Sequence, residues 1–131
     1  MKTIIQKLKL HKHNEILVLN EPKEFTALVG QLDCNVLGSL LKTSSVSCAL
    51  LFITSKKELV DQMLTLFPKL TDDSMLWIAY PNKTSKSYII ELYNDEAWDE
   101  IMDYRLQPIR QIELNSNWNA LRFRKIEYVK H

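Results

Sequence analysis

A run of polar and charged side chains directly follows an apolar stretch, Met75 to Tyr80, and has the groups needed to hold an anion. It brings a phenol, ammonium groups and hydroxyl groups together, and these donate the hydrogen bonds that a phosphate or carboxylate accepts. We therefore predict a site for a small anionic ligand here. The alternative is a solvated loop whose turn is set by Pro81. The candidate ligand-binding residues of this run are Tyr80, Lys83, Ser85 and Lys86.

Two arginines later in the chain are predicted to face each other across a hairpin. If residues 115–117 form its loop, Arg110 lies opposite Arg122, and Trp118 begins the second strand. Like charges directly opposite each other destabilise a strand pair, so this pair needs an anion. Arg110, Trp118 and Arg122 therefore join the candidate ligand-binding set. The anion is either a bound ligand or an internal carboxylate, for which the candidates are Glu91, Asp95 and Asp99.

Recognised catalytic and cofactor patterns are absent from the sequence. No Gly-x-Ser-x-Gly elbow, Walker loop or Gly-x-Gly-x-x-Gly turn follows a predicted strand, so no cofactor is predicted. The three histidines lie near the chain ends without the further ligands that a metal site needs. Cys34 and Cys48 have no paired spacing, which favours reduced thiols over a disulfide or a metal site.

Length and charge restrict the class of protein. The 131 residues fit a single domain. The net charge of +1, from 17 basic and 16 acidic residues, provides no overall field for nucleic acid or an anionic membrane. The alternation of aromatic and basic residues after Trp118 therefore favours strand packing over nucleic-acid binding. The sequence shows neither a membrane-spanning run nor a targeting peptide, which predicts a cytoplasmic location.

Apolar runs and a polar link predict the strands of a mixed sheet. Three runs have the near-continuous apolar character of parallel strands covered on both faces, and a turn at 72–74 is predicted to precede the third. A change of alternation in the last segment predicts a bulge near Arg124 and Lys125. The expected strands are the parallel runs 16–19, 46–54 and 75–80 and the antiparallel hairpin 109–114 with 118–129.

Amphipathic segments between these strands predict three helices. Ser55 and Glu58 form a capping box at the start of the second helix. The expected helices span residues 22–32, 55–67 and 94–105, and a short amphipathic helix or arm at residues 1–14 precedes the first strand. The order of elements predicts one α/β domain over residues 1–131, a three-layer sandwich whose mixed sheet has three parallel strands and a C-terminal antiparallel hairpin.

Three stretches of the sequence resemble a family of small bacterial single-domain proteins of unknown function. These stretches are ILVLNEPKEF, LWIAYPNKTSK and LQPIRQIELNSNWNALRFRK. The resemblance runs from Ile16 to the C-terminus and implies no activity. It marks Tyr80, Ser85, Lys86, Arg110, Trp118 and Arg122 among the shared positions. The sequence departs from the family pattern at residues 91–95 and at Asn119.

Three classes of function are compatible with these features. The first is a non-catalytic binding domain for a small anionic ligand at the rim of the third parallel strand. The second is a homo-oligomeric interaction or structural module that uses an exposed sheet edge. The third is a reduced methyltransferase-like enzyme, because a parallel sheet ending in an antiparallel hairpin is similar to that fold.

Overall fold

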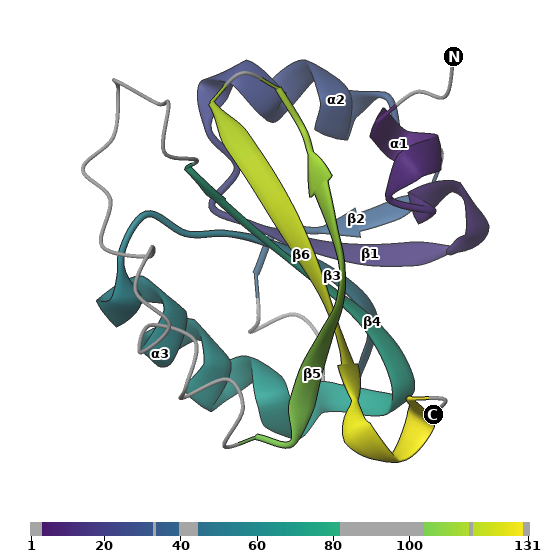
Figure 1. Cartoon of the computed structure of the whole chain (residues 1–131). Helices are drawn as coiled ribbons and strands as arrows, with labels where there is room; N and C mark the ends of the chain where they lie inside the picture. Colours follow the sequence, from purple (N-terminus) through teal and green to yellow (C-terminus); the bar gives the residue numbers. More distant parts are fainter. Residues whose placement is uncertain (1–3, 33, 40–44, 82–103, 116, 130–131) are drawn as a thin grey trace.

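The chain folds around a mixed six-stranded sheet with helical segments on both faces (Figure 1). The computed structural model describes residues 4–32, 34–39, 45–81, 104–115 and 117–129. The strand order within these residues is β2-β1-β3-β4-β6-β5. The strands are β1 (Glu15–Leu19), β2 (Asn35–Leu37), β3 (Val46–Phe52), β4 (Leu70–Pro81), β5 (Leu106–Glu113) and β6 (Trp118–Lys125).

The first four strands are parallel to one another. Strand β6 pairs antiparallel with β4, and β5 pairs antiparallel with β6. The predicted fold class is therefore confirmed, with β2 as a fourth parallel strand that was not expected. The helical segments are α1 (Ile4–Lys7), η1 (Leu10–Lys12), η2 (Lys23–Phe25), α2 (Thr26–Gly30), α3 (Lys56–Leu66), η4 (Phe67–Lys69) and η5 (Ile126–Tyr128). No helix among the described residues is long and apolar enough to cross a membrane.

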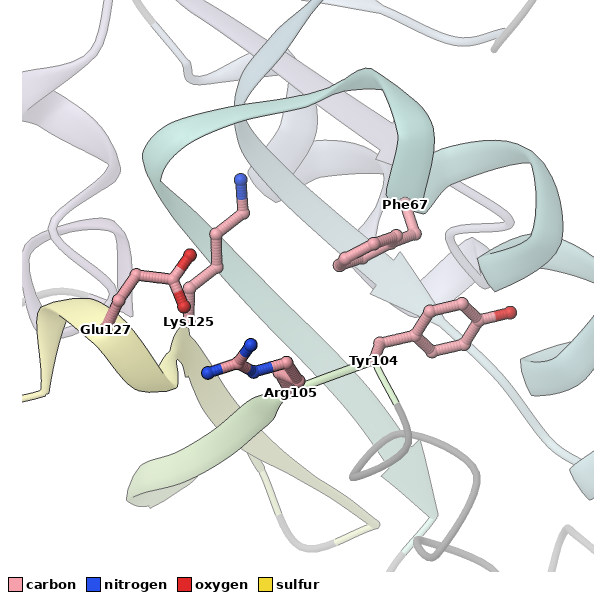
Figure 2. Close-up of a pocket in the computed structure, with 5 residues that line it drawn as sticks. All are labelled: Phe67, Tyr104, Arg105, Lys125 and Glu127. Atoms are coloured by element: carbon pink, nitrogen blue, oxygen red, sulfur yellow. The ribbon is translucent and has the colours of Figure 1, made fainter.

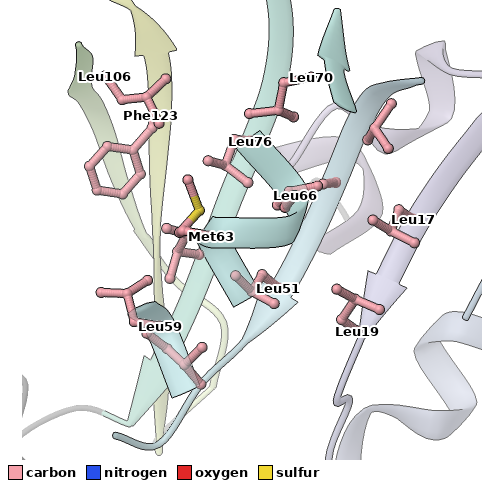
Figure 3. Close-up of a cluster of buried hydrophobic side chains, with 14 of the residues drawn as sticks. Leu17, Leu19, Leu51, Leu59, Met63, Leu66, Leu70, Leu76, Leu106 and Phe123 are labelled. Carbon is pink, nitrogen blue, oxygen red and sulfur yellow. The ribbon is translucent and has the colours of Figure 1, made fainter. Parts of the chain in front are cut away.

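One face of the sheet, here called the α3 face, is covered by helix α3. Figure 3 shows Leu59, Met63 and Leu66 of this helix packed against sheet leucines, and all three are at most 1% exposed. The predicted N-cap is present at the start of the helix, whereas the reciprocal bond of Glu58 goes to the residue before the cap and not to the cap itself. The Ser55 hydroxyl accepts from the Glu58 amide at 3.2 Å, and the Glu58 carboxylate accepts from the Thr54 amide at 2.8 Å.

The opposite face, here called the N-terminal face, is covered by residues 4–12 and by η2 and α2 (Figure 1). Leu8 is 0% exposed and Leu10 is 1% exposed, so this segment contributes to the core. The Trp77 indole of β4 donates to the Leu8 carbonyl at 3.0 Å. That bond satisfies a buried donor and ties the first residues to the middle of the sheet.

Strand β4 is longer than predicted and corrects the expected turn at residues 72–74. The strand begins at Leu70, which pairs with Val46, whereas Met75 pairs with Cys48. Two residues advance on β3 while five advance on β4, so three extra residues are accommodated within the strand as an irregularity. The polar triplet therefore interrupts the ladder locally without ending the strand.

The last strand also differs from its prediction. Strand β6 ends at Lys125 and is followed by η5, so the change of alternation marks the end of the strand. The register shift lies on β5, between Pro108 and Arg110, which makes the bulge predicted near Arg124 wrong. Proline lacks the amide hydrogen that a regular ladder needs, so a shift beside Pro108 is physically reasonable. Residues 94–103 of the helix predicted over residues 94–105 lie outside the described residues.

Arg105 occupies the left-handed backbone region, with φ 61°, immediately before β5. Its carbonyl accepts from the Ile126 amide at 2.9 Å, which holds this conformation. We expect Arg105→Gly to be more stable than Arg105→Ala by about 0.5–1 kcal/mol, because glycine adopts this region without the Cβ clash. Urea unfolding of the two variants measures the difference. If Arg105→Gly is less stable than Arg105→Ala, the backbone at position 105 is not strained.

Candidate functional site

The structure describes four of the seven predicted ligand-binding residues. Lys83, Ser85 and Lys86 lie outside the described residues. Tyr80 pairs with Asn119 near the carboxyl end of β4, and the neighbouring pair places Trp118 opposite Pro81. Arg110 and Arg122 are directly opposite each other, which confirms the predicted hairpin register.

The described members of the predicted set do not form one cluster. Tyr80 belongs to the core of the α3 face, whereas Trp118 and Ala120 belong to the core of the N-terminal face. Arg122 has the same parity on β6 as Trp118, so it lies on the N-terminal face, about 13 Å along the strand from that residue. Tyr80 and Arg122 are therefore separated by the sheet, and the anion-binding role of the whole set stays a prediction.

The Tyr80 side chain is buried and hydrogen-bonded within the protein. Burial raises the pKa of its phenol, and a hydrogen bond from Asn119 offsets part of this rise. The Gln111 amide donates to the phenol oxygen at 3.2 Å. A protonated, hydrogen-bonded phenol is suited to packing and is not poised as a general base.

The carboxyl ends of β1 and β3 form the place where an open α/β sheet usually binds ligands. The chain leaves β1 to form β2 on one side and then β3 on the other, which defines a topological switch point. Three aromatic rings, from Phe25, Phe52 and Trp118, fill the N-terminal face near this end. Their centroids lie 5.1 to 6.1 Å apart, and each of the three side chains is at most 3% exposed.

Polar groups near the aromatic rings are used within the protein. The Glu24 carboxylate accepts from the Trp118 indole at 2.7 Å and from the Asn115 amide at 2.8 Å. The Asn115 side-chain oxygen in turn accepts from the backbone amides of Asn117 and Trp118. These bonds tie the segment after β1 to the tip of the hairpin. The Thr54 hydroxyl after β3 donates to Glu58 at 2.9 Å.

A group of cationic side chains lies on the N-terminal face toward the amino ends of the parallel strands. We call Arg110, Arg122 and Arg124, together with Asp73, the arginine cluster. Arg124 and Asp73 form a bidentate ion pair, with bonds of 2.8 and 2.6 Å. Three positive charges and one negative charge leave the cluster with a formal charge of +2. The Arg124 guanidinium lowers the pKa of the Asp73 carboxyl, mainly through these hydrogen bonds.

Arg122 is the member of the arginine cluster whose burial leaves a donor without an acceptor among the described residues. Its Nε atom is buried and has no hydrogen-bond partner among the described residues. Burial lowers the pKa of its guanidinium, and the charges of Arg124 and Arg110 lower it further, while Asp73 acts in the opposite direction. An unpartnered, partly desolvated donor costs free energy, so an added anion would be stabilised here.

His13 lies close enough to Arg122 to be affected by its charge. Burial lowers the pKa of His13 from its ordinary value of 6.5, and the Arg122 guanidinium lowers it further. As the pH falls through 6.5, the unfolded chain therefore binds a proton at His13 more readily than the folded protein does. The free energy of unfolding must decrease over this range.

We expect His13→Asn to lose part of this acid sensitivity. Urea unfolding of the wild type and the variant at about pH 7.5 and 5.5, on either side of the ordinary histidine pKa, measures it. The wild type should lose more stability on acidification than the variant. Equal losses would show that His13 titrates alike in the folded and unfolded states.

The thiol of Cys48 is not a reactive group. Neither Cys34 nor Cys48 forms a disulfide within the described residues, and burial raises the pKa of the Cys48 thiol to about 12. A thiol with that pKa stays protonated at neutral pH and is a poor nucleophile. Among the described residues, no group of three histidine, cysteine, aspartate or glutamate side chains could hold a metal ion.

Two neighbours of the arginine cluster were not predicted from the sequence. Asp73 was assigned to a turn, although it lies in β4 and binds Arg124. His13 was treated as a terminal residue, although the N-terminal segment crosses the sheet near Arg122. No sequence signal could have indicated these contacts, because both depend on long-range strand and segment placement.

No family model matches the sequence, and no curated protein matches it. Solved structures of methyltransferases share its fold at low identity. A SAM-dependent methyltransferase from Aquifex aeolicus aligns with a TM-score of 0.57 at 11% identity, over 92% of this chain and 87% of that one. The N-methyltransferase NodS from Bradyrhizobium japonicum aligns with a TM-score of 0.57 at 8% identity, over 92% of each chain.

A larger methyltransferase shows the same likeness. A ribosomal protein methylase from Lactobacillus delbrueckii subsp. bulgaricus aligns with a TM-score of 0.55 at 16% identity, over 92% of this chain. The chain spans 64% of that protein, less than two thirds of its length. These comparisons define the class of the fold: an α/β, Rossmann-like methyltransferase fold with a C-terminal antiparallel hairpin.

The described residues at the switch point do not fit the cofactor that this fold implies. Glycines after β1 normally let a cofactor approach the backbone closely. Here Asn20, Glu21 and Pro22 follow β1, and Pro22 has no amide hydrogen to donate. The chain has only two glycines, Gly30 and Gly38, and neither backbone position is closely approached. The aromatic rings and internal hydrogen bonds described above occupy the adjoining face.

Proposed function

We propose that this chain is a non-catalytic binding domain for a small anionic ligand, built on a methyltransferase-like fold. The observation that carries the proposal is the buried Nε atom of Arg122, which lacks a hydrogen-bond partner among the described residues. Its guanidinium is flanked by like charges, and Arg110 directly opposite is exposed and accessible. A bound oxyanion would satisfy the donor and reduce the repulsion.

The chemistry of the arginine cluster favours a phosphate or carboxylate. A guanidinium presents planar, paired donors that match the spacing of oxygens in these anions. The Arg124 guanidinium already binds Asp73 in this way, so Arg110 and Arg122 are the members of the arginine cluster that can bind an added anion. This proposal moves the site away from the loop after β4, to the N-terminal face of the hairpin.

A thermal unfolding panel tests the proposal. The full chain is heated in phosphate, sulfate, acetate and chloride, each at the same ionic strength. We expect the melting temperature to rise with phosphate or a carboxylate relative to chloride, since a ligand that binds only the folded protein stabilises it by RT ln(1 + [L]/Kd). Identical melting temperatures across the panel would contradict the proposal.

The fold comparisons support a second candidate, a reduced methyltransferase-like enzyme. This candidate requires SAM to bind near the carboxyl ends of β1 and β3, where the described residues provide no glycine turn. Calorimetric titration of the full chain with SAM separates the two candidates. Binding of SAM would favour the enzyme, whereas its absence together with anion-dependent stabilisation would favour the binding domain.

We also propose that the chain is related to the bacterial domains of unknown function that its motifs resemble. Arg110, Trp118 and Arg122 lie within that resemblance. Their positions support a shared structural role for the hairpin, because Trp118 anchors its tip and the two arginines pair directly across its strands.

A further inference from the structure

A separate cavity opens on the α3 face near the amino ends of the parallel strands. Figure 2 shows its lining, and its volume is about 340 Å³. This is at the small end of the range for ligand pockets, so it fits a small metabolite better than a dinucleotide. The lining residues come from η4, the turn before β5, the end of β6 and η5, and they are Phe67, Tyr104, Arg105, Lys125 and Glu127.

The apolar wall of this cavity is a pair of aromatic rings. The centroids of Phe67 and Tyr104 lie 4.7 Å apart, with the ring planes tilted by 36°. Both rings pack against the buried core of the α3 face, which fixes their position, yet both are only partly buried. Exposed aromatic surface in a concave site favours a ligand that carries an aromatic ring.

Two cations lie beside the aromatic wall. Arg105 is exposed, and its backbone is held in the left-handed region by the bond from Ile126. Such a conformation is costly for a residue with a Cβ and is characteristic of functional sites. The Lys125 ammonium donates to the carbonyls of Leu70 and Thr71 at 3.3 Å, which places it above the start of β4. Neither cation forms an ion pair within the described part of the chain.

The third charged group of the lining is the carboxylate of Glu127. This side chain is exposed, and Figure 2 shows it beside Lys125. A carboxylate accepts hydrogen bonds from an ammonium group. The cavity therefore combines an aromatic wall, two cations and one anion, which is the complement of a ring, a carboxylate and an amino group.

We propose that this cavity binds a free aromatic amino acid. Its ring lies against Phe67 and Tyr104, its carboxylate is bound by Arg105 and Lys125, and its amino group is bound by Glu127. The site is distinct from the arginine cluster, which lies on the other face of the sheet. It does not depend on the proposed function, and either site can exist without the other.

Calorimetric titration with L-phenylalanine tests this proposal, in a buffer without phosphate so that the arginine cluster is not involved. Comparison ligands are 3-phenylpropionate, which lacks the amino group, and phenethylamine, which lacks the carboxylate. We expect L-phenylalanine to bind more tightly than either one. Absence of L-phenylalanine binding up to about 10 mM, a free energy weaker than roughly 3 kcal/mol, would overturn the proposal.

Two charge-neutral variants assign the contacts. Arg105→Gln should weaken L-phenylalanine binding at least tenfold, because a charge-assisted hydrogen bond is lost. Glu127→Gln should weaken L-phenylalanine binding without weakening that of 3-phenylpropionate. Lys57→Gln, an exposed change on α3 remote from the cavity lining, is the matched control and should have no effect. Unchanged binding in Arg105→Gln, or equal weakening in Lys57→Gln, would reject the site.

Discussion

Replacing Trp118 with alanine is expected to lower the free energy of unfolding by about 3–5 kcal/mol, the usual cost of truncating a buried tryptophan. The side chain is 1% exposed and contacts Phe25 and Phe52 edge to face. Its removal leaves a cavity among rings that have few ways to collapse. It also breaks the indole bond to Glu24 that ties the hairpin to the segment after β1.

Trp118→Phe separates packing from hydrogen bonding. It retains an aromatic ring but removes the donor to Glu24, and Glu24 itself is exposed and can be solvated. We therefore expect a smaller loss, on the order of 1–2 kcal/mol. Urea unfolding monitored by circular dichroism measures both variants. If Trp118→Ala lowers the free energy of unfolding by less than Trp118→Phe does, the packing of Trp118 against Phe25 and Phe52 does not stabilise the carboxyl end of the sheet.

Replacing Arg122 with methionine is expected to weaken phosphate binding by about 10- to 100-fold, the effect of losing a charge-assisted donor. Without phosphate, the same variant should be as stable as the wild type or more stable. Methionine retains the apolar stem but removes a buried donor without a partner and a charge between like charges. Opposite effects on binding and stability identify a residue that serves a ligand.

Two controls accompany the methionine variant. Arg122→Lys keeps the charge but loses the planar paired donors, so its phosphate affinity should be intermediate. Lys57→Gln makes a similar charge change on the other face and should leave phosphate affinity unchanged. Affinity is measured by calorimetry and stability by urea unfolding. If methionine at position 122 destabilises the protein without phosphate, the guanidinium is satisfied internally and the proposed role fails.

Much of the fold could be predicted because local apolar runs in the sequence mark its central strands. The runs 16–19, 46–54 and 75–80 are strongly apolar and fall within β1, β3 and β4 or overlap them closely. The hairpin register followed from the length of its loop, since the loop fixes which residues pair. Parallel strands and an antiparallel end then define the fold class.

Other elements carried no comparable signal. Strand β2 has three residues at the sheet edge, none of them buried, so no apolar run marks it. The polar triplet 72–74 resembles a turn locally, yet the pairing of Leu70 with Val46 keeps it inside β4. Tertiary pairing overrides local preference in both cases.

The faces on which the candidate residues lie could be assigned only once the partner strand of β6 was known. The sequence alone does not determine that partner. Once β6 pairs with β4, parity places Arg122 opposite Trp77 and on the other face from Tyr80. The predicted mutual repulsion of Arg110 and Arg122 followed from the hairpin alone. The absence of a hydrogen bond at the buried Nε atom among the described residues depends on the packing around it.

The most direct test of the account is the NMR signal of the Arg122 Nε–H group during titration with inorganic phosphate. The signal is assigned by its absence from the spectrum of Arg122→Met. We predict that it moves downfield and saturates as phosphate binds, because this donor gains the acceptor that it lacks. Saturation of the protein with phosphate while this signal stays in place, or no binding at all, would contradict the anion site.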